Sequence, residues 1–309
     1  MKTALIGNTG FVGSNLASQY EFTDLYNSKN IHEFAGKTYD LCICAGVRAQ
    51  KWVANQQPEK DLADIQTLIN QLEKAEIKQF VLISTIDVYP NPVHVDEKSI
   101  IEKTNHHPYG LNRLYLEEWV AHHYSEHLII RLPGLFGQNI KKNFIYDILH
   151  PVPSLFNETF FNSLIEKMAD EDLQLIGSVY LNVGINYVWN GKEEENVASC
   201  LKRYDISSLM FTDSEDVFQF YDLSELREHI TKCLEHKITC VNFVSEPVQA
   251  KDLYHFLFNT SFDNRLNRVK QFYDLKTIHA DALGGSNGYL HNKTEMCKRI
   301  KCFVEDYKK

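Results

Sequence analysis

Two segments of the chain carry side chains that could move a proton. Thr85 ends an apolar run, and Tyr109 and Arg113 stand four residues apart in a segment with helical periodicity. Residues at this spacing share a helix face, so a phenol and a cation can meet the same bound molecule. Only about one tyrosine in a thousand is ionised at neutral pH, but a cation roughly 4 Å away would lower a tyrosine pKa by about three. We therefore predict that Arg113 activates Tyr109 as a catalytic base.

A glycine-rich segment near the N-terminus has the spacing of a phosphate-binding turn. It reads Gly-Asn-Thr-Gly-Phe-Val-Gly and joins an apolar, strand-like run to a helical segment. The first glycine permits a tight turn, the second lets a pyrophosphate approach the backbone, and the third lets the helix pack close to the sheet. The helix N-terminus adds unpaired N–H groups and a partial positive charge. A purely structural turn is the alternative, but we predict dinucleotide contacts at Gly7, Thr9, Gly10, Phe11, Val12 and Gly13.

The tip of the second strand usually selects between NAD and NADP. In NAD-binding proteins a carboxylate there bonds the adenine-ribose hydroxyls. This strand is predicted to end near Tyr26 and is followed by Asn27, Ser28 and Lys29, without an acid. Hydroxyl and cationic side chains suit a 2'-phosphate, so the sequence favours NADP over NAD. Asp24 is the alternative selector if the strand ends two or three residues away from this position.

The elements that position these residues alternate between strands and helices. Apolar strand-like runs recur between segments of helical periodicity, and the alternation predicts an α/β fold, a Rossmann-type doubly wound parallel sheet. We expect a cofactor-binding domain at 1–150, with later strands returning from about 205–245. The remainder, 151–309, is expected to be mainly a smaller α/β substrate region. The predicted strands are Thr3–Ile6, Tyr39–Ala45, Phe80–Ser84 and Leu128–Leu132, and the helices Phe11–Tyr20, Asp61–Ala75 and Tyr109–Tyr124.

Composition narrows the class of protein. The chain has 309 residues, 44% of them hydrophobic and 24% charged, which is typical of folded enzymes. A net charge of −9 argues against nucleic acid as a partner. We find neither a signal peptide nor a run of roughly 18 apolar residues, and therefore expect a cytoplasmic protein without membrane contact. The seven cysteines form no CxxC pair, and we expect no metal site.

Three further motifs follow the glycine turn in a fixed order. They are Ser84-Thr85-Ile86-Asp87-Val88-Tyr89 at a strand end, Tyr109-Gly110-Leu111-Asn112-Arg113 on the next helix, and Arg131-Leu132-Pro133-Gly134-Leu135-Phe136-Gly137 after the next strand. Together they resemble the extended short-chain dehydrogenase/reductase family, the NAD(P)-dependent epimerases, dehydratases and reductases of nucleotide sugars. The resemblance implies Tyr-assisted hydride transfer on a nucleotide-linked or related sugar.

The resemblance also assigns roles to individual residues. Thr85 would polarise the reacting sugar oxygen, Tyr109 would exchange its proton, and Arg113 would contact the nicotinamide ribose. Family analogy further implies a homodimer. The additional cofactor contacts would be Ala45, Gly46 and Pro133, and the additional substrate contacts Asp87, Gly134, Lys142 and Asn143.

Four positions depart from the family pattern. Arg113 stands where the family has lysine, Gly134 where it has asparagine, and Val217 where it has an arginine. The acidic pair of the dehydratases is reduced to Ile86-Asp87. An NAD(P)-binding sensor or scaffold that has lost turnover is therefore the alternative function. Among enzymes, the sequence does not choose between epimerase, reductase and dehydratase.

Overall fold

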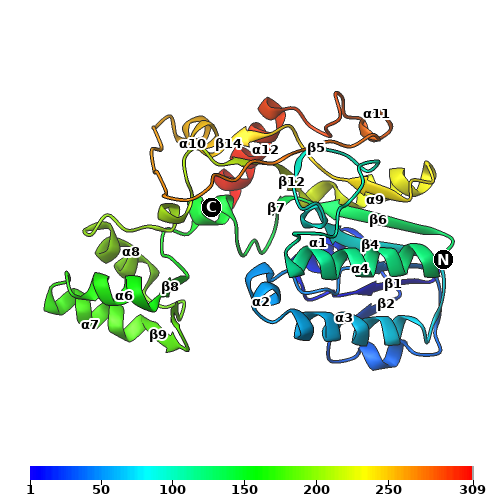
Figure 1. The fold of residues 1–309 in the computed structure, drawn as a ribbon, viewed down its shortest axis with the longest axis horizontal. Coiled ribbons are helices and arrows are strands. Elements are labelled where there is room, and N and C mark those ends of the chain that lie inside the picture. Colours follow the sequence, from blue (N-terminus) through cyan, green and yellow to red (C-terminus); the bar gives the residue numbers. More distant parts are fainter. Residues whose placement is uncertain (308–309) are drawn as a thin grey trace.

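A six-stranded parallel sheet forms the centre of the molecule, and the computed structural model describes residues 1–307 (Figure 1). The strand order is β13-β6-β4-β3-β1-β2. The late strand β13 pairs with β6 far from its neighbours in sequence, so the chain returns to the first sheet. The strands are β1 Thr3–Ile6, β2 Asp24–Tyr26, β3 Thr38–Cys44, β4 Glu76–Thr85, β6 His127–Leu132 and β13 Cys240–Asn242.

Helices cover both faces of this sheet, as the alternating pattern predicts. Successive strand residues point to opposite faces, and in β1 Leu5 joins one core cluster while Ala4 and Ile6 join the other. On the Leu5 side lie α1 Phe11–Gln19 and α9 Leu226–Glu235, and on the other α3 Pro58–Leu72 and α4 Pro108–His123. The short α2 Lys51–Gln56 packs against α3 and α4. The predicted Rossmann-type doubly wound sheet is therefore confirmed.

The last third of the chain, together with the segment 134–149, builds a second core beside the sheet. There β12 pairs in parallel with β7 and β11 pairs with β14, while α10 packs on α12. These elements are β7 Gly134–Phe136, β11 Val217–Phe218, β12 Phe220–Asp222, β14 Val248–Gln249, α5 Phe144–Leu149, α10 Ala250–Phe258 and α12 Lys293–Tyr307. Shorter elements are β5 Val93–Val95, β15 Asp274–Leu275, α11 Ala280–Leu283, and the 3-10 turns η1 Ile31–Phe34, η2 Ile86–Val88, η3 Ser208–Phe211 and η4 Leu223–Glu225.

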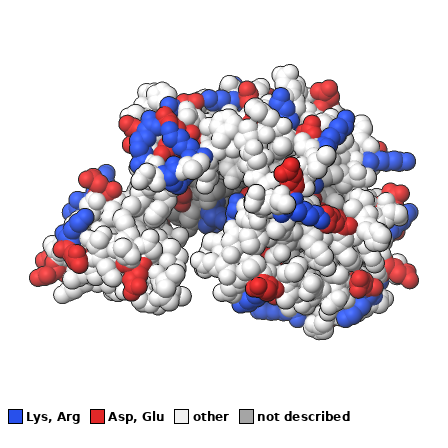
Figure 2. Space-filling view, viewed as in Figure 1, with Lys and Arg blue, Asp and Glu red and all other residues white. Residues whose placement is uncertain are grey.

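A small lobe projects beside the main body (Figure 1). It has a three-stranded antiparallel sheet of order β8-β10-β9 and its own aromatic core, in which Phe161 stacks on Tyr187 at 3.8 Å between ring centroids. Figure 2 shows a hollow between this lobe and the main body, with Lys or Arg side chains at its back. The lobe contains β8 Leu155–Asn157, α6 Glu158–Ile165, α7 Asp170–Val179, β9 Tyr180–Val183, β10 Asn186–Trp189 and α8 Glu194–Lys202.

Across residues 1–307, every helix is too short or too polar to cross a bilayer. The division at residue 150 stays a prediction.

Candidate active site

The glycine turn lies at the carboxyl edge of the sheet, and its first and third glycines are packed too tightly for any other residue. Gly7 has a φ of +89°, and a Cβ there would lie 2.4 Å from the Ala45 carbonyl oxygen. A Cβ on Gly13 would lie 2.0 Å from the Gly7 oxygen. Gly10 is exposed and is the N-cap of α1, where no side chain bonds the free N–H groups. Unpaired donors and exposed backbone at a helix N-terminus fit the pyrophosphate of a dinucleotide.

The second strand of the sheet ends where the sequence predicts it. β2 ends at Tyr26, and Asn27 and exposed Ser28 follow in the turn. The Asp24 carboxylate accepts a hydrogen bond of 2.7 Å from the Tyr39 hydroxyl, two residues before the end of the strand. Asp24 is therefore engaged within the protein rather than placed at the strand tip.

Thr85 and Tyr109 lie next to each other at the same edge. Thr85 ends β4, and its hydroxyl accepts the Asp87 N–H at 3.2 Å and caps η2. The same hydroxyl is close enough to the Tyr109 phenol to oppose the effect of burial on the Tyr109 pKa. Pro108 begins α4, and the helix starts so close to η2 that a Cβ on Gly110 would lie 2.2 Å from the Asp87 carbonyl oxygen. This close packing brings the buried Tyr109 side chain to the end of the neighbouring strand.

Arg113 faces Tyr109 but is bound by an acid that the sequence analysis did not identify. Its guanidinium lies 4.3 Å from the centroid of the Tyr109 ring. Two of its nitrogens donate to the two carboxylate oxygens of Asp61, at 2.6 and 3.0 Å, and it also donates to the Arg48 carbonyl. Asp61 lies on α3, and both side chains of the pair are largely buried. Hydrogen bonds from Arg113 and Asn112 help to lower the pKa of Asp61, although burial acts in the opposite direction.

The charge of Arg113 favours the Tyr109 phenolate, as predicted, but the net effect of the surroundings on the Tyr109 pKa is the opposite. The pKa of Tyr109 is raised, because burial of the phenol outweighs the opposing effect of Arg113. The carboxylates of Asp87 and Asp61 add to the rise. The prediction considered the nearby cation alone, whereas the structure adds desolvation and two acids.

Two basic side chains lie close to the Asp87 carboxylate. Lys51 on α2 bonds the Asp87 carboxylate at 2.6 Å, and the His107 Nε2 atom lies 4.0 Å from it. His107 also caps α4, because its Nδ1 atom accepts the Gly110 N–H. Burial lowers the pKa of His107, and the charge of Lys51 acts in the same direction. Neither Lys51 nor His107 was predicted as a site residue, since only the fold brings both to Asp87.

Lys142 reaches the same region from the loop before α5. Its ammonium donates to the Ala49 carbonyl, next to the Arg48 carbonyl that accepts from Arg113. Loss of hydration lowers the pKa of Lys142, and the charges of Lys51 and Arg113 lower it further. The carboxylate of Asp87 acts in the opposite direction. These interactions place the Lys142 ammonium in the same charged region as the predicted catalytic residues.

Two predicted substrate contacts also have structural roles. The Gly134 N–H donates to the Gln219 carbonyl, and a Cβ at Gly134 would lie 3.0 Å from that oxygen and from the Phe220 ring. An asparagine does not fit there without a shift of β12. The Asn143 side chain caps α5 by accepting two backbone N–H groups, and it donates to the Leu135 carbonyl. Pro133 connects β6 to β7 beside the predicted cofactor site.

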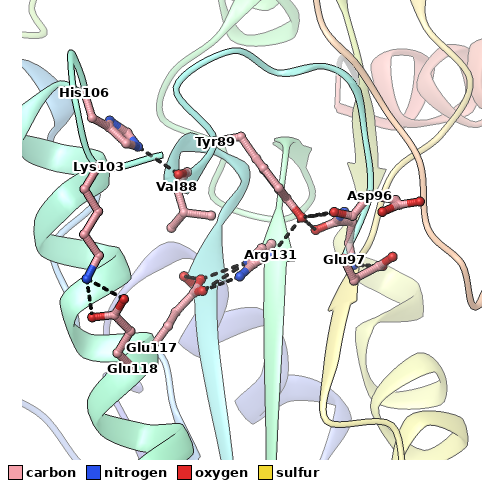
Figure 3. Close-up of polar contacts among 11 residues, drawn as sticks. Val88, Tyr89, Asp96, Glu97, Lys103, His106, Glu117, Glu118 and Arg131 are labelled. Atoms are coloured by element: carbon pink, nitrogen blue, oxygen red, sulfur yellow. Dashed lines mark hydrogen bonds and ion pairs between the residues drawn. The ribbon is translucent and has the colours of Figure 1, made fainter. Parts of the chain in front are cut away.

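A buried ion pair fastens α4 to the sheet (Figure 3). Arg131 on β6 bonds both carboxylate oxygens of Glu117, which follows Arg113 by one helical turn. The Ser84 hydroxyl donates to the same carboxylate, and Arg131 donates to the Tyr89 hydroxyl at 2.6 Å. The network therefore sets the position of α4 against the end of β4, where Thr85 lies.

The sheet, the glycine turn and this edge define an NAD(P)-binding protein of the Rossmann type. The model of the NAD dependent epimerase/dehydratase family matches residues 19–178, which is more than half of the chain. The chain therefore belongs to this family, and the resemblance noted from its motifs is confirmed. No curated protein sequence matches it.

Solved structures of low sequence identity share the whole fold. RMD from Pseudomonas aeruginosa complexed with NADPH is 14% identical, with 99% of each chain covered and a TM-score of 0.63. UDP-glucose 4-epimerase from Thermotoga maritima with UDP-glucose is 12% identical, covers 100% of this chain and 99% of its own, and has a TM-score of 0.59. The NDP-hexosamine 5,6-dehydratase TunA is 13% identical, with coverages of 99% and 97% and a TM-score of 0.59.

Proposed function

We propose that this protein is an NAD(P)-dependent oxidoreductase of the epimerase, reductase or dehydratase type that acts on a nucleotide-linked or related sugar. The observation that carries this proposal is the contact between Thr85 and Tyr109 at the carboxyl edge that also holds the uncapped glycine turn. A hydroxyl pair beside a dinucleotide site suits proton transfer coupled to hydride transfer.

The chain's own residues would hold and protonate the reacting oxygen. When bound, the nicotinamide supplies or accepts the hydride. Thr85 donates a hydrogen bond to the sugar oxygen, and Tyr109 exchanges a proton with it. Tyr109 is buried and Thr85 is half-buried, so little water reaches the phenol, which strengthens these hydrogen bonds. Arg113 lies over the ring of Tyr109 and orients the phenol. Two of its guanidinium nitrogens already donate to Asp61, so they do not bind the nicotinamide ribose.

We assign the substrate to the hollow between the main body and the small lobe (Figure 2). Two of the predicted substrate contacts, Asp87 and Lys142, are charged residues in the same region as Tyr109. A nucleotide sugar also agrees with the structural neighbours, one of which was solved with UDP-glucose.

We further propose that NADP is preferred to NAD. The turn after β2 offers Asn27 and Ser28, and the carboxylate of Asp24 is already bound to Tyr39. One neighbour was solved with NADPH, which is compatible with this preference. Calorimetry with the purified protein should show tighter binding of NADPH than of NADH. A clear preference for NADH would mean that another group selects the ribose.

Turnover separates this proposal from the alternative of a cofactor-binding sensor or scaffold. The sensor gains support from the raised pKa of Tyr109 and from Arg113 being held by Asp61. The protein should be incubated with NADP(H) or NAD(H) and a panel of nucleotide sugars, their 4-keto forms included. Conversion of any of them supports the enzyme. Tight cofactor binding without conversion of any panel member would support the sensor.

Assembly and location are further proposals. We propose a homodimer by analogy with the family, and sedimentation of the purified protein tests it. A cytoplasmic location stays a prediction.

A further inference from the structure

The ion pair between Asp61 and Arg113 changes the charge that Tyr109 experiences. Both carboxylate oxygens of Asp61 accept from the guanidinium, and both side chains are largely buried. A paired guanidinium exerts a much weaker field on a neighbouring group than a free one, because the two charges are close together and oppose each other. At Tyr109 the guanidinium of Arg113 favours the phenolate, and the carboxylate of Asp61 opposes part of that effect.

The other charged groups around Tyr109 do not strengthen the effect of Arg113. Lys51 on α2 is paired with Asp87 at 2.6 Å, and Asp87 itself disfavours the phenolate. The His107 ring lies 6.3 Å from the Tyr109 ring on the same helix, and its own pKa is lowered by burial, which favours the neutral form. Lys142 is held at the Ala49 carbonyl.

We propose that Asp61 is a positioning residue that pairs with Arg113, weakens the effect of the guanidinium on Tyr109, and so adds to the effect of burial in keeping Tyr109 a protonated phenol, ready to protonate a carbonyl oxygen during reduction of a keto sugar. This inference rests on the proposed function. It adds that the reaction runs as a reduction and that Asp61 favours this direction. Asp61 acts through Arg113 and need not touch the substrate.

The reductive step balances with these groups. A bound dihydronicotinamide supplies a hydride with two electrons and is oxidised. The hydride forms a C–H bond at the carbonyl carbon, the C=O π bond breaks, and the oxygen takes the Tyr109 proton. The ketone becomes a secondary alcohol, and the Tyr109 phenolate regains a proton from solvent.

Asp61→Asn tests the inference through the pH dependence of reduction by NADPH. Without the carboxylate, the charge of Arg113 is free to stabilise the phenolate, so the pH above which the reductive rate falls should move down by about one unit. The double variant Asp61→Asn/Arg113→Met removes both charges. In this variant, the pH above which the reductive rate falls should return toward the wild-type value. Asp64→Asn is the matched control on α3, because within residues 1–307 Asp64 forms an ion pair with the exposed Arg48, at 3.8 Å, and not with Arg113. Asp64→Asn should leave the pH dependence of the reductive rate unchanged.

A second readout does not depend on turnover. The ultraviolet absorbance of tyrosinate is titrated in each protein and in its Tyr109→Phe counterpart, and the difference reports Tyr109 alone. Asp61→Asn should lower the pH at which this signal appears. Asp61→Ser is the second variant if Asp61→Asn does not fold, because the smaller side chain leaves room for water around Arg113.

The two ways of failing are distinct. Folded Asp61 variants in which neither the rate profile nor the Tyr109 titration moves would overturn the role of Asp61. If the wild-type protein converts no sugar at all, the proposed function fails, and the titration still decides whether Asp61 controls the protonation of Tyr109.

Discussion

Tyr109 and Arg113 lie on one face of α4, but their surroundings give them different tasks. The phenol contacts Thr85, whereas the guanidinium is engaged by Asp61 and the Arg48 carbonyl. Burial and the nearby acids favour the protonated phenol. Proton transfer in the proposed reaction therefore depends on the Tyr109 hydroxyl, and Arg113 acts on its position and charge.

Replacing Tyr109 by phenylalanine tests this assignment. The variant keeps the ring that Arg113 covers but loses the proton donor, so turnover on the identified substrate should fall by roughly 100-fold or more. NADPH affinity, measured by calorimetry, should change little. Tyr115→Phe is the control, because Tyr115 lies on the same helix with its side chain exposed. Near-normal rates in Tyr109→Phe would make Tyr109 a structural aromatic.

At the scale of elements, α1 and α4 present their N-termini to the same edge of the sheet. The start of α1 offers uncapped N–H groups, and the start of α4 places Tyr109 beside Thr85. The buried pair of Glu117 and Arg131 holds α4 in this position (Figure 3). Helix placement, and not the helix sequence alone, therefore builds the site.

Gly10→Val tests the role of α1. The valine side chain would occupy the exposed space where we expect a pyrophosphate, and beyond its neighbours in the chain, its Cβ would contact the Gly7 oxygen at 3.3 Å. The variant should fold and lose NADPH binding in calorimetry. Gly177→Val is the control, because Gly177 lies in α7 of the small lobe with open space around it. Unchanged affinity in folded Gly10→Val would remove the assignment of the turn.

Alanine substitutions of two adjacent glutamates on α4, Glu117 and Glu118, test whether the ion pair of Glu117 with Arg131 stabilises the helix position. Glu117→Ala leaves the buried Arg131 without its partner and should lower the free energy of unfolding by about 3–5 kcal/mol in urea denaturation. Glu118→Ala removes only an exposed pair with Lys103 and should cost at most about 1 kcal/mol. Equal losses in the two variants would show that the buried pair does not hold α4.

At the scale of the whole molecule, long-range contacts join the cofactor half to the late part of the chain. β13 returns to the main sheet, and β12 pairs with β7 directly after the predicted cofactor residues. Buried His229 on α9 bonds the Tyr221 hydroxyl of β12 at 2.8 Å. The stability of this junction should therefore depend on keeping His229 neutral.

The pH dependence of unfolding follows from this junction. Burial lowers the pKa of His229 to about 4, whereas the unfolded chain has a histidine pKa of about 6.5. The unfolded state therefore binds a proton first, and stability is lost as the pH falls from about 6.5 toward 4, by up to about 3 kcal/mol. His229→Asn should flatten this part of the profile in urea denaturation, whereas His255→Asn, at an exposed position, should not. An unchanged slope in His229→Asn would contradict the assignment.

Local sequence patterns determined the parallel sheet, the glycine turn and the shared helix face of Tyr109 and Arg113. Hydrophobic periodicity and the requirement for glycine are properties of short segments, so they can be recognised without knowing the fold. The end of β2 and the junction of Thr85 with Tyr109 also follow, because parallel strands place their carboxyl ends at one edge.

Only the tertiary structure decided what those residues experience. Asp61 meets Arg113 across 52 positions of sequence, and Lys51 meets Asp87 across 36. No local pattern predicts such pairs. Gly134 and Asn143 likewise have packing and capping roles that depend on β12 and α5. The pKa of Tyr109 reverses the expectation from sequence, because desolvation and the charges of distant residues act only once the chain has folded.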